Sequence, residues 1–251
     1  MTPESVPALE TRGLTKRFGG LTVNAGLDLR IAPGEARAVI GPNGAGKTTL
    51  INQIAGHLRP DQGEILFQGG PIAGWPPYRI ARLGIGRSFQ QTNLFFEFSV
   101  FENVRLAAQS HLPRMLRVWR GAGAYGPVNE RAEQALETVG LAHRRGARAG
   151  GLSHGEQRQL ELAMVLALRP KLLLLDEPMA GLSLEESRRI TELLLELKRD
   201  HTILLIEHDM DAVFAIADRI TVLVHGQEIA TGDAEAVRTD PAVIEAYLGE
   251  D

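Results

Sequence analysis

The sequence predicts an α/β fold in which a largely parallel sheet follows antiparallel strands and carries an inserted helical subdomain. Strand-length apolar runs alternate with helix-like segments; the runs are 36–40, 171–175, 202–206 and 219–224. Runs that are apolar throughout are typical of a parallel sheet covered by helices on both faces. Between about 91 and 152 the pattern is helical, and no strand-like run returns until Lys171. A helical insertion explains this break better than a second independent domain does.

The N-terminal part predicts an antiparallel hairpin. Residues 9–18 and 21–31 alternate apolar and polar side chains and are joined by Gly19-Gly20, which is a turn signal between strands. A further short strand is expected at 64–67, before Gly69-Gly70. Phe18 ends the first strand, and it is either a platform for an adenine ring or a core aromatic; the sequence leaves both interpretations open.

A phosphate-binding loop joins the strand 36–40 to a helix that begins at Lys47. Its residues match the G-x-x-x-x-G-K-[ST] pattern in a strand–loop–helix context, and they are Gly41, Pro42, Asn43, Gly44, Ala45, Gly46, Lys47, Thr48 and Thr49. Glycines let successive backbone N–H groups wrap a phosphate chain, and the helix directs its positive N-terminal end at that chain. Lys47 supplies a charge for the β- and γ-phosphates, and the Thr48 hydroxyl suits Mg²⁺. The sequence therefore predicts a nucleoside-triphosphate site.

Polar side chains follow three predicted strands at the sheet edge where ligands of open parallel sheets bind. Asp176 and Glu177 follow the apolar run 172–175. We expect Asp176 to hold Mg²⁺ and Glu177 to orient or deprotonate an attacking water. Gln90 ends a predicted strand from Ile85, and His208 follows the strand 202–206. Adjacent acids at a strand end are often solvated loop residues, and the phosphate loop is what favours the catalytic interpretation.

The segment Leu152 to Gln157 begins a predicted helix and has two compatible interpretations. Ser153 and Glu156 fit a capping box, which alone explains both residues. The same geometry leaves N–H groups and a hydroxyl at a positive helix end, ready for an anion. Ser183 and Glu186 form a second capping-box pattern, which needs no function to exist.

Composition limits the classes of protein that fit. A chain of 251 residues with 44% hydrophobic and 23% charged residues is ordinary for a globular protein. The absence of cysteine excludes disulfides and cysteine-ligated metals and favours a reducing compartment. The start lacks a signal-peptide pattern, and no run reaches the ~18–20 apolar residues of a membrane span. A net charge of −4 gives no case for nucleic acid as a partner. We expect a cytoplasmic chain without a membrane span of its own.

The chain resembles the nucleotide-binding subunits of ATP-binding-cassette (ABC) transporters over almost all of its length. The family's motifs occur in family order: the base-stacking aromatic Phe18, the Walker A loop 41–48, the Q-loop Gln90, the signature 152–157, the Walker B pair Asp176 and Glu177, the D-loop 180–183 and the switch His208. The resemblance implies one ABC ATPase domain, 1–251, with a P-loop NTPase (RecA-like) core sheet. The core is expected at 7–90 and 160–251, with an N-terminal antiparallel β subdomain, and the helical subdomain at about 91–159.

More narrowly, the chain resembles the ATPases of branched-chain (hydrophobic) amino-acid uptake systems, whose relatives serve urea and amides. The residues that carry this match are 84–90, 179–182, 207–210 and 246–249. Three departures stand out: Phe18 replaces a common tyrosine, His154 the signature's first glycine and Ser183 the D-loop aspartate. Phenylalanine keeps the stacking surface, whereas Ser183 puts communication between subunits through that loop in question.

The resemblance implies an ATPase that binds ATP and Mg²⁺ in a head-to-tail pair of cassettes. Lys47, Gln90, Glu177 and His208 would be catalytic; Thr48, Gln90 and Asp176 would hold Mg²⁺; and Ser153, Gly155 and Glu156 would face ATP on the other cassette. Two membrane permease subunits and, indirectly, a substrate-binding protein would be the further partners, at the cytoplasmic face of the inner membrane. The alternatives are a urea or amide importer ATPase and a soluble ABC ATPase. A P-loop kinase or GTPase does not explain the signature helix or Glu177.

Two segments beyond the motifs suggest surfaces. Five phenylalanines fall within 89–101 and cannot all face one core on a regular period. Several should point outward and mark a docking surface for a membrane subunit, with Phe96 as the first candidate. Arg114, Arg117 and Arg120 alternate with apolar residues, which fits either a lipid-headgroup contact or a solvated loop.

Overall fold

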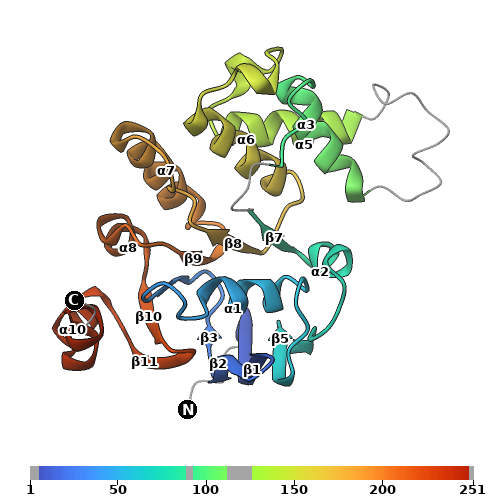
Figure 1. Cartoon of the computed structure of the whole chain (residues 1–251). Helices are drawn as coiled ribbons and strands as arrows, with labels where there is room; N and C mark the ends of the chain where they lie inside the picture. The colour runs from blue at the N-terminus through green and yellow to red at the C-terminus, as the bar shows by residue number, and fades with distance from the viewer. Residues whose placement is uncertain (1–5, 89–92, 112–125, 249–251) are drawn as a thin grey trace.

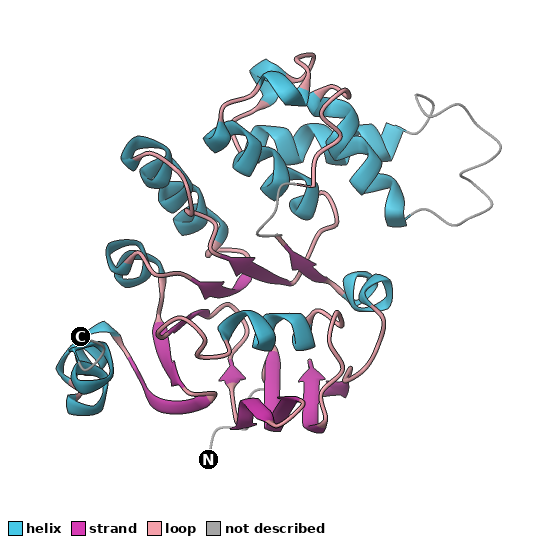
Figure 2. Ribbon diagram, in the orientation of Figure 1, coloured by secondary structure: helices cyan, strands magenta, loops and turns pink. Residues whose placement is uncertain are grey.

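The computed structural model describes residues 6–88, 93–111 and 126–248. It contains two sheets with helices around them and confirms the predicted α/β fold, with its antiparallel N-terminal part and a helical insertion. Figures 1 and 2 show the smaller sheet at the bottom, the larger sheet above it, and a group of helices at the top. Gln90 and the stretch Arg114 to Arg120 lie outside the described residues.

The smaller sheet has the order β2-β1-β5-β6, with β3 also paired to β1; its strands are β1 (Leu9–Phe18), β2 (Leu21–Leu27), β3 (Arg30–Ile31), β5 (Gln62–Phe67) and β6 (Gly70–Pro71). Phe18 pairs with Leu21 across Gly19-Gly20, which confirms the predicted hairpin. The expectation of one strand over 21–31 was wrong. The hydroxyl of Thr11 donates to the Leu27 carbonyl and accepts from the Leu29 N–H, both at 2.9 Å. The Thr11 N–H also donates to the Leu29 carbonyl at 2.8 Å. The hydroxyl therefore bridges the gap between β2 and β3, where the strand is interrupted.

The larger sheet has the order β11-β10-β4-β9-β8-β7, and all its pairs are parallel except that of β10 with β11. Its strands are β4 (Ala36–Ile40), β7 (Ile85–Arg87), β8 (Leu172–Asp176), β9 (Thr202–Ile206), β10 (Arg219–Val224) and β11 (Gln227–Gly232). Ile206 lies opposite Asp176 on one side and Val39 on the other. The carboxyl ends of β4, β8 and β9 therefore meet at one edge of the sheet.

Alternate residues of β8 separate the two faces of this sheet. Leu172 and Leu174 belong to the hydrophobic cluster that contains α1 (Lys47–Ile54) and strands of the smaller sheet. Leu173 and Leu175 belong to the cluster that contains α6 (His154–Leu166) and α7 (Leu184–Leu197). This alternation is the period of two that a strand imposes. In Figure 1, α1 lies between the two sheets and α7 lies on the other side of the larger sheet.

The helical insertion is built from α3 (Val100–Ala108), α5 (Gly126–Thr138) and α6, with 3₁₀ turns at Gln109–His111, Ala142–Arg144 and Ala149–Gly151. Val104, Leu136 and Leu160 are fully buried at 0% exposure and belong to the core that these helices share with α7. The helical pattern expected between about 91 and 152 contains α3 and α5.

The remaining helices are α2 (Pro77–Leu83), α8 (Met210–Ile216), α9 (Ala234–Thr239) and α10 (Pro241–Leu248). Figure 1 places α10 beside β11, away from the helical insertion. Across the part of the chain that the structure describes, no helix combines the length and the apolar character needed to cross a membrane.

Candidate nucleotide site

The phosphate loop encloses a cavity of about 220 Å³ at the carboxyl end of β4. Its lining comprises the loop residues from Asn43 to Thr49 together with Val23 and Glu177. The structure therefore brings the predicted phosphate loop and one of the two predicted strand-end acids to the same cavity. The remaining loop residues, Gly41 and Pro42, turn the chain out of β4.

Two glycines make this loop possible. Gly41 has a φ of 148°, and a Cβ there would lie 2.0 Å from the Leu223 carbonyl oxygen. Gly46 precedes α1 with a φ of 96°, and a Cβ would lie 2.5 Å from both the Val23 carbonyl oxygen and the Asn24 amide nitrogen. Any side chain at either position would have to displace backbone. The loop is thus held against β2 and β10 in a tight turn of the kind whose backbone can wrap an anion.

Lys47 lies in the cavity with its ammonium folded onto the loop. The Nζ atom donates to the carbonyl oxygens of Gly41 and Pro42, the latter at 2.9 Å. Burial lowers the pKa of Lys47, while Glu177 and Asp176 partly offset this effect. The ammonium group thus bonds to two backbone carbonyl oxygens. Phosphate oxygens in the same place would make stronger, charge-assisted hydrogen bonds.

Asp176 is held by Arg87, a residue that the sequence interpretation did not single out and whose side chain is 11% exposed. Its Oδ2 atom lies 3.3 Å from Arg87 Nη2, and Arg87 Nη1 donates to Asn52 Oδ1 at 2.6 Å. The other oxygen, Oδ1, is buried and has no hydrogen-bond partner among the described residues. Burial raises the pKa of this carboxyl, and the charge of Arg87 opposes that rise. A buried carboxylate oxygen without a partner is the donor that a hard divalent cation takes.

Glu177 adopts a left-handed backbone conformation with a φ of 50°. Its N–H donates to the Ile206 carbonyl at 2.9 Å, and its carbonyl accepts from the Ala180 N–H at 3.1 Å. Such strain in a residue other than glycine persists only where surrounding contacts fix it. Here it turns Glu177 away from the direction of the buried Asp176 and into the phosphate cavity.

Glu207 fixes the two loops that flank the site, and the sequence interpretation gave it no role. It is 1% exposed and accepts from Met179 N at 2.8 Å, His208 N at 2.9 Å and Asp209 N at 3.4 Å. His208 itself is exposed, and its Nδ1 lies 3.6 Å from Glu207 Oε2. The structure thus places His208 at the expected sheet edge, in the loop between β9 and α8.

The signature segment does not line the phosphate cavity; it lines a separate pocket at the N-terminus of α6. The capping box of Ser153 and Glu156 is present, and Glu156 also pairs with Arg144 at 3.3 Å. Ser153 and Gly155 instead contact Glu186, the N3 residue of α7, whose own capping box with Ser183 is present.

Phe18 is 48% exposed at the end of β1, which makes the alternative of a core aromatic wrong. Lys16 Nζ lies 5.4 Å from its ring centroid. Among the other phenylalanines, Phe95, Phe96 and Phe98 are 50%, 45% and 44% exposed, as the sequence pattern predicts for part of this group.

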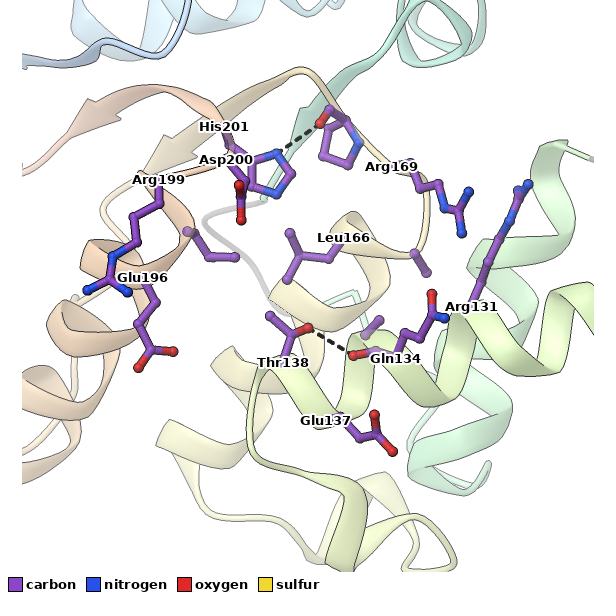
Figure 3. A pocket seen from close by; sticks show the side chains of 14 residues that line it. Arg131, Gln134, Glu137, Thr138, Leu166, Arg169, Glu196, Arg199, Asp200 and His201 are labelled. Atoms are coloured by element: carbon purple, nitrogen blue, oxygen red, sulfur yellow. Dashed lines mark hydrogen bonds between the residues drawn. The ribbon is translucent and has the colours of Figure 1, made fainter.

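A second cavity, of about 610 Å³, opens between the ends of α5, α6 and α7. Figure 3 shows charged side chains of both signs around it, including Arg131, Glu196 and Asp200. His201 Nδ1 lies 3.0 Å from the Pro170 carbonyl on its wall. This cavity lies beside the residues that precede β8 and β9, at the sheet edge opposite the phosphate loop, so the nucleotide chemistry is not located there.

A glycine-rich loop between a buried strand and a helix, facing acids at the end of a parallel strand, defines a P-loop nucleoside triphosphatase. The profile of the ABC transporter family matches residues 25–180, and that of the branched-chain amino acid ATP-binding cassette transporter matches residues 227–251. The chain belongs to the ABC transporter family and is an ABC ATPase.

Several known proteins are similar to the chain. It is 42% identical to the high-affinity branched-chain amino acid transport ATP-binding protein LivG of Escherichia coli, over 98% of this chain and 99% of LivG. A solved ATP-binding cassette in its ADP conformation superposes with a TM-score of 0.86 at 32% identity, covering 97% of this chain and 99% of that one. A dimeric post-hydrolysis cassette bound to ADP and Pi gives a TM-score of 0.75 at 25% identity, with 90% and 98% covered.

Proposed function

We propose that this chain is the ATP-hydrolysing subunit of an importer of branched-chain or other hydrophobic amino acids. The substrate class rests on LivG, whose name states branched-chain amino acid transport. The observation that carries the mechanism is the shared cavity of the phosphate loop and Glu177. In this proposal Glu177 accepts a proton from the attacking water, and Lys47 neutralises charge on the β- and γ-phosphates.

The site also fits Mg²⁺. Asp176 offers a buried oxygen without a hydrogen-bond partner in the described part of the chain, and Thr48 brings a hydroxyl to the phosphate cavity. We propose these two residues and Gln90 as the groups that hold the ion. When bound, the ion would supply positive charge that offsets the charge developing on the phosphates. Phe18 would stack on the base, and His208 would contact the γ-phosphate from the end of β9.

The two separate pockets support a composite site. Ser153 and Gly155 provide two donors at the positive end of α6, but they line a different pocket from the phosphate loop. A second cassette placed head-to-tail would bring its own signature helix to this phosphate loop. The dimeric cassette with ADP and Pi is a precedent for the pairing of two cassettes. Losing one preorganised donor of this kind costs ~10²–10³ in rate, so an unpaired chain should hydrolyse ATP poorly.

The surface beside β7 suits a membrane-subunit helix. A small hollow of about 160 Å³ has a mostly apolar wall that includes Ala107, Met164, Val165 and Leu168. The exposed aromatic rings of Phe95 and Phe98 stack with centroids 5.3 Å apart in the segment just before α3. We propose that a short cytoplasmic helix of one of the two permease subunits docks here, which would hold the chain at the cytoplasmic face of the membrane. A substrate-binding protein would act through those permeases.

The composite site is tested by mixing two inactive variants. Lys47→Ala damages the phosphate loop and Ser153→Ala damages the signature helix. A head-to-tail pair of one variant with the other keeps one site intact, whereas each variant alone keeps none. We therefore expect ATP turnover to return on mixing. Continued inactivity of the mixture would contradict head-to-tail pairing of this chain with itself.

The substrate is tested by uptake into vesicles that carry the complete transporter. Leucine uptake that depends on ATP supports the proposal. Uptake of urea or an amide alone would contradict the proposed substrate class but not the proposed ATPase role. An active ATPase that never associates with membrane subunits would favour the soluble class of ABC ATPase.

A further inference from the structure

The anion site of the signature helix is already filled by a carboxylate of the same chain. Glu186 Oε1 accepts a hydrogen bond from Ser153 Oγ at 3.1 Å and another from the Gly155 N–H at 2.9 Å. These donors lie at the N-terminus of α6, where the helix dipole favours a negative charge. One oxygen of Glu186 thus occupies both donors that the proposed function assigns to a phosphate.

The fit between Glu186 and this helix end is close. A Cβ on Gly155 would lie 2.7 Å from Glu186 Cγ and 2.8 Å from Oε1, so a side chain there would collide with the carboxylate group. The pKa of Glu186 is lowered to about 2, first by the Gly155 N–H and next by contacts from Ser183. The group is therefore ionised at neutral pH.

The second oxygen of Glu186 ties this contact to the catalytic loop. Oε2 accepts from the Ser183 N–H at 3.1 Å and from the Ser183 hydroxyl at 2.9 Å. Ser183 ends the short loop that begins at Glu177, and it caps α7. A single carboxylate consequently links the signature helix to the segment that carries the proposed catalytic base.

We propose that Glu186 is an intramolecular stand-in for the γ-phosphate, which keeps the signature helix occupied until ATP on a second copy displaces it. This inference rests on the proposed head-to-tail pairing. The serine hydroxyl and the glycine N–H each have one hydrogen to donate. While both are given to Glu186, neither is available to a phosphate. The Glu186 carboxylate and the phosphate would also repel each other at one helix end. The phosphate must therefore replace the carboxylate there and cannot bind beside it.

Displacement of Glu186 has a consequence beyond the signature helix. When Oε1 leaves Ser153 and Gly155, the carboxylate remains attached to Ser183 through Oε2. Arrival of the partner's nucleotide would then alter the contacts of the loop between Glu177 and α7 in the same chain. The exchange therefore couples occupancy of one composite site to the loop beside the other.

The test measures ATP-dependent pairing in a chain that cannot complete hydrolysis. Glu177→Gln is the background, and light scattering gives the Mg-ATP concentration for half-maximal dimer. Adding Glu186→Gln should lower that concentration about tenfold, because an amide oxygen competes for the donors less well than a carboxylate. Glutamine still serves at the N3 position of a capping box, so α7 keeps its cap.

The matched control is Glu185→Gln in the same background. Glu185 precedes Glu186 on α7 and pairs with Arg189 at 2.6 Å, so its replacement removes the same charge from the same helix turn. The ATP requirement should stay at the background value. Glu186→Asp is the second variant: it keeps the charge, but its shorter side chain should not span Ser183 and Gly155, and it too should lower the requirement.

The outcomes separate this inference from the proposed function. If Glu177→Gln pairs with ATP but replacement of Glu186 leaves the requirement unchanged or raises it, the stand-in role is overturned and the composite site remains. If Glu185→Gln lowered the ATP requirement by the same factor, the change in net charge would explain the effect, and the stand-in role would also be overturned. If Glu177→Gln never pairs at any ATP concentration, the proposed pairing fails, and the inference fails with it.

Discussion

Arg87 Nη2 lies 3.3 Å from Asp176 Oδ2, and both side chains are nearly closed to solvent, at 11% and 0% exposure. This ion pair joins the ends of β7 and β8 and reaches α1 through Asn52. Desolvation makes the pair costly to form, but removing one partner leaves a buried charge without compensation. Arg87 is thus a positioning residue for the carboxylate proposed to hold Mg²⁺.

Replacing this arginine should destabilise the fold. Arg87→Met keeps much of the side-chain volume and removes the charge, and the free energy of unfolding should fall by about 3 kcal/mol. Urea denaturation measures the change. Arg12→Met is the control, because Arg12 makes an exposed pair with Glu10 and its loss should have little effect. Equal stability of the two variants would mean that Arg87 does not compensate Asp176.

Glu207 should matter for both stability and turnover. Glu207→Ala removes the acceptor of three N–H groups in the loops after β8 and β9. Charge-assisted bonds of this kind predict a loss of about 3 kcal/mol in the free energy of unfolding. ATP turnover should fall as well, because the Met179 contact positions the segment next to Glu177. A variant with wild-type denaturation and turnover would remove Glu207 from this role.

Lys47→Ala should weaken nucleotide binding itself. The ammonium contacts ground-state phosphates in our account, so the affinity for ATP should fall by about tenfold or more. Calorimetric titration measures it, with Lys198→Ala as control, since Lys198 pairs with Asp218 away from the cavity. Unchanged affinity combined with lost turnover would instead restrict Lys47 to the transition state.

Phe96→Asp should separate folding from assembly. Its side chain is 45% exposed, so the variant should keep its melting temperature and its ATP affinity. Co-purification with the membrane subunits and amino-acid uptake should both be lost. Ile244→Asp, at an apolar residue of α10 that is 43% exposed and lies away from the helical insertion (Figure 1), is the matched control and should assemble normally. Unfolding of the Phe96 variant would place the ring in the core, and surviving transport would place the docking surface elsewhere.

Most of the fold could be predicted from local sequence patterns. The strands expected at 202–206 and 219–224 agree with β9 and β10 residue for residue, because buried parallel strands are marked by their own apolar runs. The strand expected at 21–31 failed for one local reason, the left-handed Gly26 with a φ of 74°, and for one nonlocal reason. The hydroxyl of Thr11, which bridges the interruption, comes from the neighbouring strand, and nothing within 21–31 signals that contact.

The residues of the site can be sorted in the same way, into those with local sequence patterns and those whose contacts are distant in sequence. The phosphate loop and the strand-end acids have local patterns, and the structure brings the loop and Glu177 to one cavity. For Arg87, Glu186 and Glu207, the contacts that matter at the site are distant in sequence. The capping box of Glu186 was visible locally, but its contact with the signature was not, and Glu207 reaches Met179 across 28 positions. Arg87 and Asp176 are 89 positions apart, and Glu186 reaches the signature across 31 and 33 positions. A charged residue at the end of an apolar strand was the available hint for Arg87 and Glu207.

In the proposed mechanism, Glu177 deprotonates the attacking water in the phosphate cavity. The most direct measurement is ATP turnover by Glu177→Gln within the assembled transporter, alongside Mg-ATP affinity. The amide cannot take the proton, so turnover should fall by ~10²–10⁴ while affinity stays near wild type. Near-normal turnover by this variant would contradict the account and assign the base to another group.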